Sequence, residues 1–266
     1  MRIVTTLMAL SLSATAVANP AFNRIASFQV IDNMPAGMDP AKTESSAEII
    51  AASEDGMTLA YTDSPLKALG FIDIRDPKSP KAGGSIKLGG EPTSVAVAGG
   101  KALAGINTSK NYLQPSGRLG VFDIAARTVE AHCELGGQPD SVAVSPDRSI
   151  IAVAIENERD EDLNDGALPQ MPAGDVAIFS LRGGVPDCAS IKRVDLSGLS
   201  RVGGDDPEPE FVSINARNEI VVTLQENNHL AVIDGKSGKV VANFPAGAVD
   251  LKGVDVKRDG ALTFSG

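Results

Sequence analysis

The stretch Gly-Gly-Glu-Pro-Thr-Ser-Val-Ala-Val at residues 89–97 decides the fold, because it returns as Gly-Gly-Gln-Pro-Asp-Ser-Val-Ala-Val at residues 136–144. The prolines of the two copies are 47 positions apart (139 minus 92). Looser copies begin near residues 46, 207 and 251. Self-similarity at a fixed period of this length is typical of repeat architectures.

Each copy continues in the same way. A short strand of alternating residues leads into a turn such as Glu54-Asp55-Gly56 or Pro146-Asp147-Arg148, and a second strand, a polar loop, a third strand and an outer strand follow. Four strands per roughly 40–47 residues is the period of a propeller blade. We therefore expect an all-β fold over residues 46–266: a β-propeller of about four four-stranded blades plus the start of a fifth, an incomplete ring. The Trp-Asp signature of one common propeller class is missing, since the chain has no Trp.

The first residues predict export. Arg2 is followed by a short apolar run that ends at Ala16-Val17-Ala18, a small-x-small cleavage site, so residues 1–18 are interpreted as a signal peptide. The alternative, a membrane anchor, would need about 20 apolar residues. Residues 19–45 are expected to be an extended segment before the propeller. The predicted location is periplasmic or secreted, with no membrane span after signal cleavage.

The net charge of the chain limits the classes of molecule that it is expected to bind. Thirty-four acidic and 24 basic residues give a formal net charge of -10. A nucleic-acid partner is disfavoured, because binding to phosphate backbones requires clustered Lys and Arg. An acidic chain is compatible with cation binding, although it is more often a matter of solubility.

Two cysteines, Cys133 and Cys188, fall in or just before the outer strands of the second and third repeat units. Outer strands of adjacent blades lie close together at the rim of a propeller. An exported chain with an even number of cysteines usually pairs them. We predict a disulfide between the two; the alternative is a pair of buried thiols.

Polar residues recur in two kinds of loop, the one before the first strand of each unit and the one after its second strand. In a propeller both kinds emerge on one face, around the central channel. Oxygen-rich groups of this type suit Ca²⁺, which takes several carboxylate and carbonyl ligands. The alternative is that they are ordinary solvated loop residues. The predicted metal ligands are Glu156, Glu158, Glu208, Glu210 and Glu226, and the predicted ligand-binding residues are Asn107, Glu156, Asn157, Gln225, Asn227 and Asn228.

The third unit is longer than the others because of an acidic insert that begins near Glu156. The insert is either a solvated loop or a lid that holds cations over the channel. It lacks the spacing of an EF-hand. Catalytic signatures are weak: the only histidines are His132 and His229, and no Gly-x-Ser-x-Gly elbow or dinucleotide fingerprint occurs.

Several of these stretches resemble a known family. Asp206-Pro-Glu-Pro-Glu-Phe-Val, the run from Val222 to Asp234, and Gly70-Phe-Ile-Asp-Ile-Arg-Asp-Pro look like the choice-of-anchor I family. The resemblance runs from about Ser46 to Gly266. It implies an exported β-propeller that is often associated with the cell surface, with relatives named alkaline-phosphatase-like or phytase-like. Members of the family are much longer, so the chain looks like their N-terminal half. The resemblance carries no catalytic residue onto this chain.

Two hypotheses for function follow. The first is an exported propeller that binds an unidentified ligand or protein partner, the missing C-terminal half among the candidates, with Ca²⁺ as a candidate cofactor. The second is the N-terminal part of a metal-dependent phosphoesterase, in which the same glutamates would hold cations that clamp a phosphate and activate water. The sequence favours the binding module, because no nucleophile or base stands out.

Overall fold

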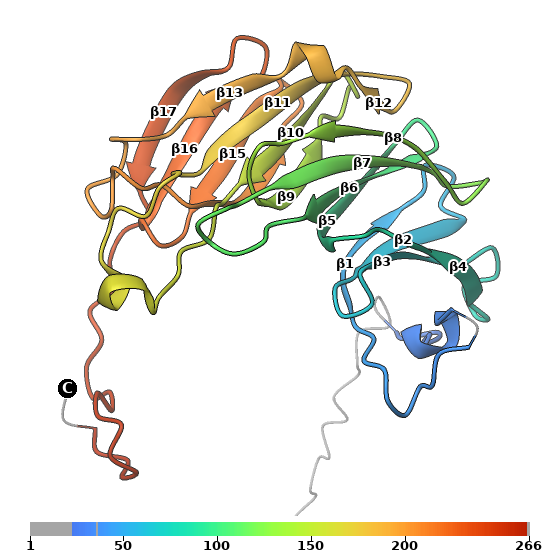
Figure 1. Cartoon of the computed structure of the whole chain (residues 1–266), viewed down its shortest axis with the longest axis horizontal. Helices are drawn as coiled ribbons and strands as arrows, with labels where there is room; N and C mark the ends of the chain where they lie inside the picture. Colours follow the sequence, from blue (N-terminus) through green and yellow to red (C-terminus); the bar gives the residue numbers. More distant parts are fainter. Residues whose placement is uncertain (1–22, 36, 265–266) are drawn as a thin grey trace, which may run out of the picture.

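The computed structural model describes residues 23–35 and 37–264, and in this part of the chain almost all regular structure is β-strand. Seventeen strands form four consecutive antiparallel sheets (Figure 1). The all-β prediction is confirmed. The predicted signal peptide at residues 1–18 lies outside the described residues.

Each sheet corresponds to one repeat unit and is called a blade here. Blade 1 contains β1 (Ala47–Ala52), β2 (Thr58–Asp63), β3 (Ala68–Asp73) and β4 (Lys81–Lys87). Blade 2 contains β5 (Glu91–Ala98), β6 (Lys101–Asn107), β7 (Gly117–Asp123) and β8 (Thr128–Glu134). Blade 3 contains β9 (Pro139–Val144), β10 (Ile150–Ile155), β11 (Asp175–Arg182), β12 (Val185–Pro186) and β13 (Lys192–Asp195). Blade 4 contains β14 (Pro209–Ile214), β15 (Glu219–Leu224), β16 (His229–Asp234) and β17 (Lys239–Pro245).

The burial pattern of the second strands shows how the blades are stacked. Every residue of β10 is buried, because blade 3 has a neighbouring blade on both faces. In β15 buried and half-buried residues alternate, so only one face of blade 4 is covered. Successive side chains of a strand point to opposite faces, and the two patterns therefore distinguish an internal from a terminal blade.

Three apolar cores hold the blades together, and each lies between two neighbouring sheets. Blades 1 and 2 share a core that includes Leu69, Phe71, Ala104 and Phe122. The other two cores are built in the same way. The core of blades 2 and 3 includes Leu103, Val121, Val153 and Phe179, and that of blades 3 and 4 includes Ala152, Ile178, Val222 and Ile233.

The blades follow one another around an arc, and their first strands contact each other in the order β1, β5, β9 and β14 (Figure 1). This arrangement confirms the propeller prediction. The expected start of a fifth blade differs: residues 246–264 contain no strand. In the four formed blades the first strand is held by a hydrogen-bonded ladder to the second, and the stretch from Leu251 makes no such ladder among the described residues.

The predicted disulfide is confirmed. Cys133 in β8 and Cys188 in the 3₁₀ turn η3 (Cys188–Ser190) are bonded, with their Cα atoms 5.3 Å apart. The bond fastens the outer edge of blade 2 to that of blade 3. Disulfides persist in oxidising compartments, so the bond fits an extracellular or otherwise non-cytoplasmic protein.

The segment before β1 covers part of the outer face of blade 1. Its 3₁₀ turn η1 (Val30–Asn33) buries Asn33, whose side chain donates to Tyr61 Oη at 3.0 Å and to the carbonyl of Phe71 at 2.9 Å. The same side chain both donates to and accepts from the backbone of Gly84. The Tyr61 ring lies across Gly70, where an added Cβ would come within 2.1 Å of the Cζ atom. Blade 1 is therefore capped by its own chain.

Candidate functional site

The loops before the first strand and after the second strand meet on one face of the arc, as predicted. In blade 3, Asn157 Oδ1 accepts the backbone N–H of Gln138 at 2.9 Å. In blade 4, Asn227 Oδ1 accepts the N–H of Glu208 at the same distance. Both amide groups also donate to loop carbonyls, and both residues are buried. These two asparagines hold the loops in place.

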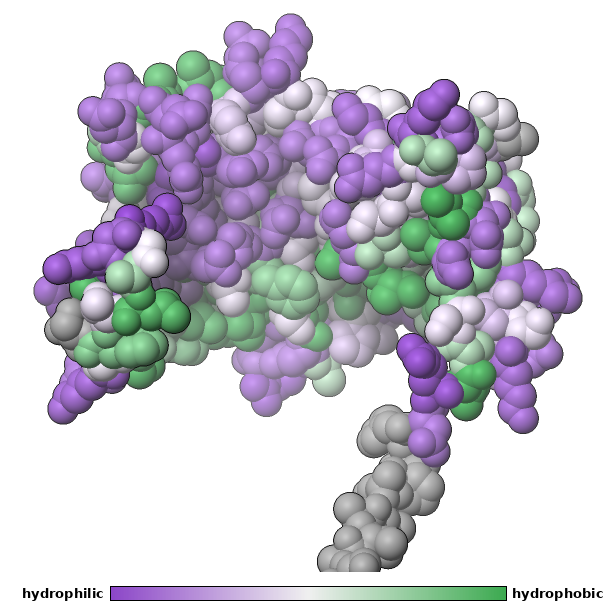
Figure 2. All heavy atoms as spheres, turned by 90° about the horizontal axis from the view of Figure 1, so that it is seen from below, coloured by the Kyte–Doolittle hydropathy of each residue, from purple (hydrophilic) through white to green (hydrophobic). Residues whose placement is uncertain are grey.

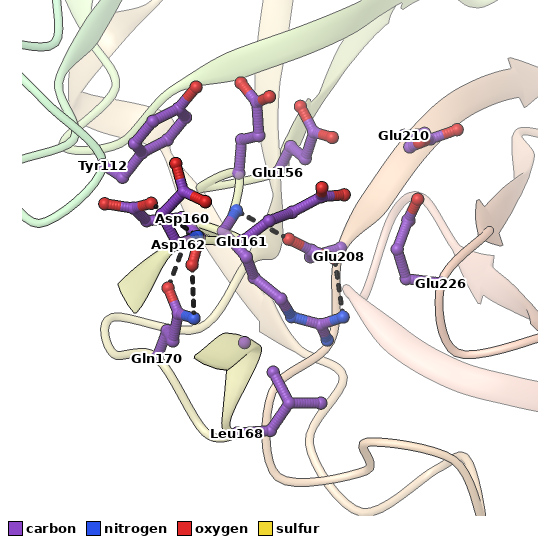
Figure 3. A pocket seen from close by; sticks show the side chains of 13 residues that line it. Tyr112, Glu156, Asp160, Glu161, Asp162, Leu168, Gln170, Glu208, Glu210 and Glu226 are labelled. Carbon is purple, nitrogen blue, oxygen red and sulfur yellow. Dashed lines mark hydrogen bonds and ion pairs between the residues drawn. The ribbon is translucent and has the colours of Figure 1, made fainter. Parts of the chain in front are cut away.

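A cleft of about 690 Å³ opens where these loops of blades 3 and 4 face the insert after β10. All five predicted metal ligands line it, together with the insert and one aromatic residue from blade 2 (Figure 3). Figure 2, which looks into the open side of the arc, shows hydrophilic residues gathered in its hollow. The lining residues are Tyr112, Glu156, Glu158, Arg159, Asp160, Glu161, Asp162, Gly166, Leu168, Gln170, Glu208, Glu210 and Glu226.

Arg159 is the one basic residue of this lining, and its guanidinium group is already paired with carboxylates. Its Nη1 lies 2.9 Å from Glu208 Oε2, and its Nε lies 3.3 Å from Asp206 Oδ2. The backbone N–H of Arg159 also donates to Glu208 Oε1 at 2.9 Å. Both carboxylates are buried. The arginine therefore fastens the insert to the loop before β14 and leaves the other carboxylates without a basic partner in the lining.

The insert is also tied to itself. Gln170 accepts the N–H of Asp160 and donates to its carbonyl, both at 2.9 Å. Its own N–H donates to Asp206 Oδ2 at 2.7 Å. These bonds hold part of the insert as a wall of the cleft, while residues 161–162 and 164–169 are exposed.

Burial, and after it the charge of neighbouring carboxylates, raises the pKa of four acidic residues at or beside the cleft. Burial raises the pKa of Glu156 to about 8, and the charges of Asp140, Glu158, Glu210 and Glu208 add to the effect. Burial likewise raises the pKa of Glu208 to about 7, although Arg159 opposes it. The pKa of Glu210 rises to about 7 and that of Asp140 to about 6, in each case mainly through burial and then through neighbouring carboxylates. These four groups therefore hold their protons to a higher pH than isolated carboxyl groups do, because the site disfavours their charged forms.

The predicted ligand-binding residues are divided by the structure. Of the six, only Glu156 lines the cleft. Asn157 and Asn227 support its loops, as described above. Gln225 and Asn228 are exposed in the loop that carries Glu226, and the Asn228 amide donates to the carbonyl of Gly247. Asn107 lies in blade 2, where it accepts the N–H of Ser109.

Two lining residues were not singled out from the sequence. Tyr112 comes from the loop between β6 and β7 and stands beside the acidic insert (Figure 3). Nearby carboxylates, Glu158 first, raise the pKa of its hydroxyl. Arg159 lies inside the acidic insert, and the acidic residues around it in the sequence gave no indication that it pairs with Asp206 and Glu208. The scarcity of Tyr, with two in the chain, is the signal that could have drawn attention to Tyr112.

The carboxylate oxygens of the cleft are of the type that binds a hard cation, but they are not positioned around one point as in a formed metal site. Carboxylate oxygens are the ligands that Ca²⁺ prefers. Among residues 23–35 and 37–264, however, no three Asp, Glu, His or Cys side chains are placed to hold one metal ion. Glutamate side chains would have to turn toward a common point to coordinate it. In the same ranges no helix has the length and apolar character needed to cross a membrane.

Several solved structures are similar to this chain. Kuenenia stuttgartiensis hydrazine synthase is 13% identical with a TM-score of 0.43, over 75% of this chain and 74% of that one. A nidogen/laminin complex is 14% identical with a TM-score of 0.49, over 75% and 64%. A protein of unknown function from Bacteroides caccae is 12% identical with a TM-score of 0.48, over 80% and 65%. The second and third matches span less than two thirds of the solved chain.

No curated protein matches the chain. The choice-of-anchor I domain, in contrast, matches residues 48–263, which include all four blades and the cleft. The match agrees with the repeat, with the four sheets and with the resemblance drawn from residues 206–234 and 70–77. The chain belongs to the choice-of-anchor I domain family.

Proposed function

We propose that this protein is an exported propeller module that binds a cationic ligand in the cleft between blades 3 and 4. The observation that carries the proposal is the acidity of the lining: eight carboxyl groups surround the cleft, and its single arginine is paired with Glu208 and Asp206. A bound cation would lower the cost of keeping Glu156, Glu208 and Glu210 ionised. Ca²⁺ is the first candidate, because the available donors are oxygens.

The placement of the carboxylates also favours a second candidate, an extended organic cation such as a polyamine. The carboxylates line a cleft of about 690 Å³, and no three of the described acidic side chains form a compact metal site. An ammonium chain could meet several separated carboxylates at once. Tyr112 would add a ring face, which attracts ammonium groups.

The phosphoesterase hypothesis depends on the same first step. An acidic cleft repels phosphate until a bound cation reverses the sign of its field. A test of cation binding therefore comes before any test of activity. No side chain in the cleft favours phosphoester cleavage over simple binding.

Calorimetry and thermal melting with Ca²⁺ and, separately, with spermidine test the proposal. A ligand that binds only the folded state stabilises it by about 1.4 kcal/mol when its free concentration is ten times Kd. We expect Ca²⁺ to raise the melting temperature of the wild type, and Glu156→Gln combined with Glu210→Gln to reduce that rise. Spermidine giving the larger, saturable shift would select the organic cation instead.

Glu91→Gln is the matched control, because Glu91 is the exposed first residue of β5 and does not line the cleft. It removes the same kind of charge from the same face. Equal ligand-induced shifts in the wild type, the double variant and the control would contradict binding in the cleft. The absence of heat and of any shift with both ligands would overturn the cation proposal altogether.

A further inference from the structure

The repeat that defines the blades also places a serine in the first strands of blades 2 and 3. Ser94 lies in β5 within Pro-Thr-Ser-Val, and Ser141 lies in β9 within Pro-Asp-Ser-Val. Both residues are buried. A buried hydroxyl group needs a hydrogen-bond partner, because leaving it unpaired costs free energy. Both serines find that partner outside their own sheet.

Each serine accepts a backbone N–H from the first strand of the following blade. Ser94 Oγ accepts the N–H of Val142 in β9 at 3.1 Å, and Ser141 Oγ accepts the N–H of Val212 in β14 at 3.2 Å. The strands β5, β9 and β14 belong to three different sheets, so neither bond is part of a strand ladder. The two serines therefore join neighbouring blades where their first strands meet.

The bond of Ser141 lies next to the cleft. In β9, Ser141 directly follows Asp140, whose carboxyl group is close enough to Glu226 of the cleft lining to interact with its charge. In β14, Val212 lies two residues after Glu210, which also lines the cleft. Consecutive residues of a strand are about 3.3 Å apart. The bond therefore joins the backbones of the two blades within about 7 Å of acidic residues on both sides.

Blades 3 and 4 also make polar contacts at both ends of these first strands. On the cleft side, the N–H of Arg159 in the insert donates to Glu208 Oε1 at 2.9 Å. At the opposite end, Asn218 Nδ2 in the turn after β14 donates to Asp147 Oδ2 in the turn after β9, at 2.8 Å. Both contacts hold loops or turns. The bond of Ser141, in contrast, holds the strands themselves.

We infer that Ser141 is a positioning residue of the cleft, whose hydroxyl group sets the spacing between the wall from blade 3 and the wall from blade 4. Ser141 does not line the cleft itself. Apolar packing between the blades is non-directional, so a hydrogen bond is needed to fix one relative position of the two strands. Without it, the walls would hold the binding arrangement for only part of the time, and the apparent affinity would fall by that fraction. The effect on affinity rests on the proposed cation binding, whereas the effect on spacing does not.

Hydrogen exchange of single backbone amides, followed by NMR without any ligand, tests the spacing. In Ser141→Ala the N–H of Val212 loses its acceptor, and the N–H of Arg159, which reaches from the insert to blade 4, should loosen with it. We expect both amides to exchange several-fold faster than in the wild type. Ser94→Ala is the matched control, because it removes the same kind of bond between blades 2 and 3. It should speed the exchange of Val142 alone.

Two results of the exchange experiment would overturn the inference. If Ser141→Ala leaves the exchange of Arg159 unchanged, the serine stabilises only its own strand contact and does not position the cleft. If Ser94→Ala loosens Arg159 as much as Ser141→Ala does, the loss reflects the overall stability of the protein. Circular dichroism checks that both variants fold.

Calorimetry with Ca²⁺ and, separately, with spermidine extends the test to binding. Ser141→Ala should bind several-fold more weakly whichever cation the wild type binds, and Ser94→Ala should bind it with unchanged affinity. A wild type that binds neither cation would contradict the proposed function, and the exchange data alone would then decide the role of Ser141. Binding that is equally tight in the wild type and in Ser141→Ala would refute the positioning role.

Discussion

The two ends of the arc differ in how far their apolar side chains are covered and their polar groups are hydrogen-bonded. The outer face of blade 1 is covered by the segment that contains Asn33, and Tyr61 beneath it is 2% exposed. The outer face of blade 4 leaves Phe211 60% exposed. The loop carboxylates differ in the same sense. Asp63 of blade 1 is buried and accepts from the backbone N–H groups of Ser46 and Leu66, whereas Glu156 lies among other carboxylates.

This difference indicates which end of the arc is the better candidate for contacts with a ligand or a partner molecule. At the blade 1 end, hydrogen-bond donors and apolar cover come from the chain itself. At the blade 4 end, negative charge in the cleft and apolar area on the sheet face remain unmatched. Exposed apolar patches and uncompensated charges mark sites of interaction more often than satisfied ones do. The cation-binding proposal concerns this end.

The largest loss of folding stability is expected from a substitution on an outer apolar face that the chain covers. Ile72 lies on the outer face of blade 1, opposite Leu59, and is buried. Ile72→Ala should lower the free energy of unfolding by about 2–4 kcal/mol, because it removes packed methylenes and leaves a cavity. Val232→Ala, on the outer face of blade 4, should cost about 1 kcal/mol or less. Urea unfolding of both variants checks the pair, and equal losses would mean that the two faces are equally covered.

The cap on blade 1 should show the next largest effect. Asn33→Ala leaves the carbonyl of Phe71 and the backbone of Gly84 without their partner inside the protein. Unpaired buried groups of this kind cost about 1–3 kcal/mol. Asn111→Ala, at an exposed position in the loop after β6, should change the stability by about 0.5 kcal/mol or less. A loss for Asn33→Ala as small as that of the control would show that the cap does not stabilise blade 1.

A further prediction concerns the pH dependence of stability that the cleft contributes. The pKa of Glu156 is raised to about 8 in the folded state, from an ordinary value of 4.5. Between these values the folded state keeps a proton that the unfolded state has released, so stability falls as pH rises from about 5 to 8. Glu156→Gln should flatten this fall, and Glu91→Gln should leave it unchanged. Urea midpoints at pH 5, 6.5 and 8 measure the difference, and identical profiles would contradict the assigned shift.

The repeat made much of the fold predictable. Prolines 92 and 139 set the period, and the four blades, the disulfide and the shared face of the loops followed from it. The glutamates of the cleft were predictable for the same reason, because their strand positions place them on one face. The roles of Asn157 and Asn227 were not, since an amide next to a loop can bind a ligand or the backbone, and the loop path decides which.

Other features depend on contacts that no local pattern contains. Arg159 pairs with Glu208 across 49 positions, and nothing in the acidic insert indicates that partner. Tyr112 reaches the cleft from a different blade. The repeat copy after Leu251 has the composition of a strand, but a strand also needs a partner edge, which sequence periodicity does not reveal.

The shared cores have a consequence for how the molecule comes apart. Each apolar core joins two neighbouring blades, so stability is mainly a sum of nearest-neighbour couplings, as in linear repeat proteins. Blade 4 has one such coupling, no cap and no disulfide, and we expect fraying to begin there. Its partner in that coupling is blade 3, which supplies the opposite wall of the cleft. A ligand that bridged Glu156 and Glu226 would therefore hold blades 3 and 4 together at the interface that is expected to open first. Binding of such a ligand would then be measurable as slower proteolysis of blade 4.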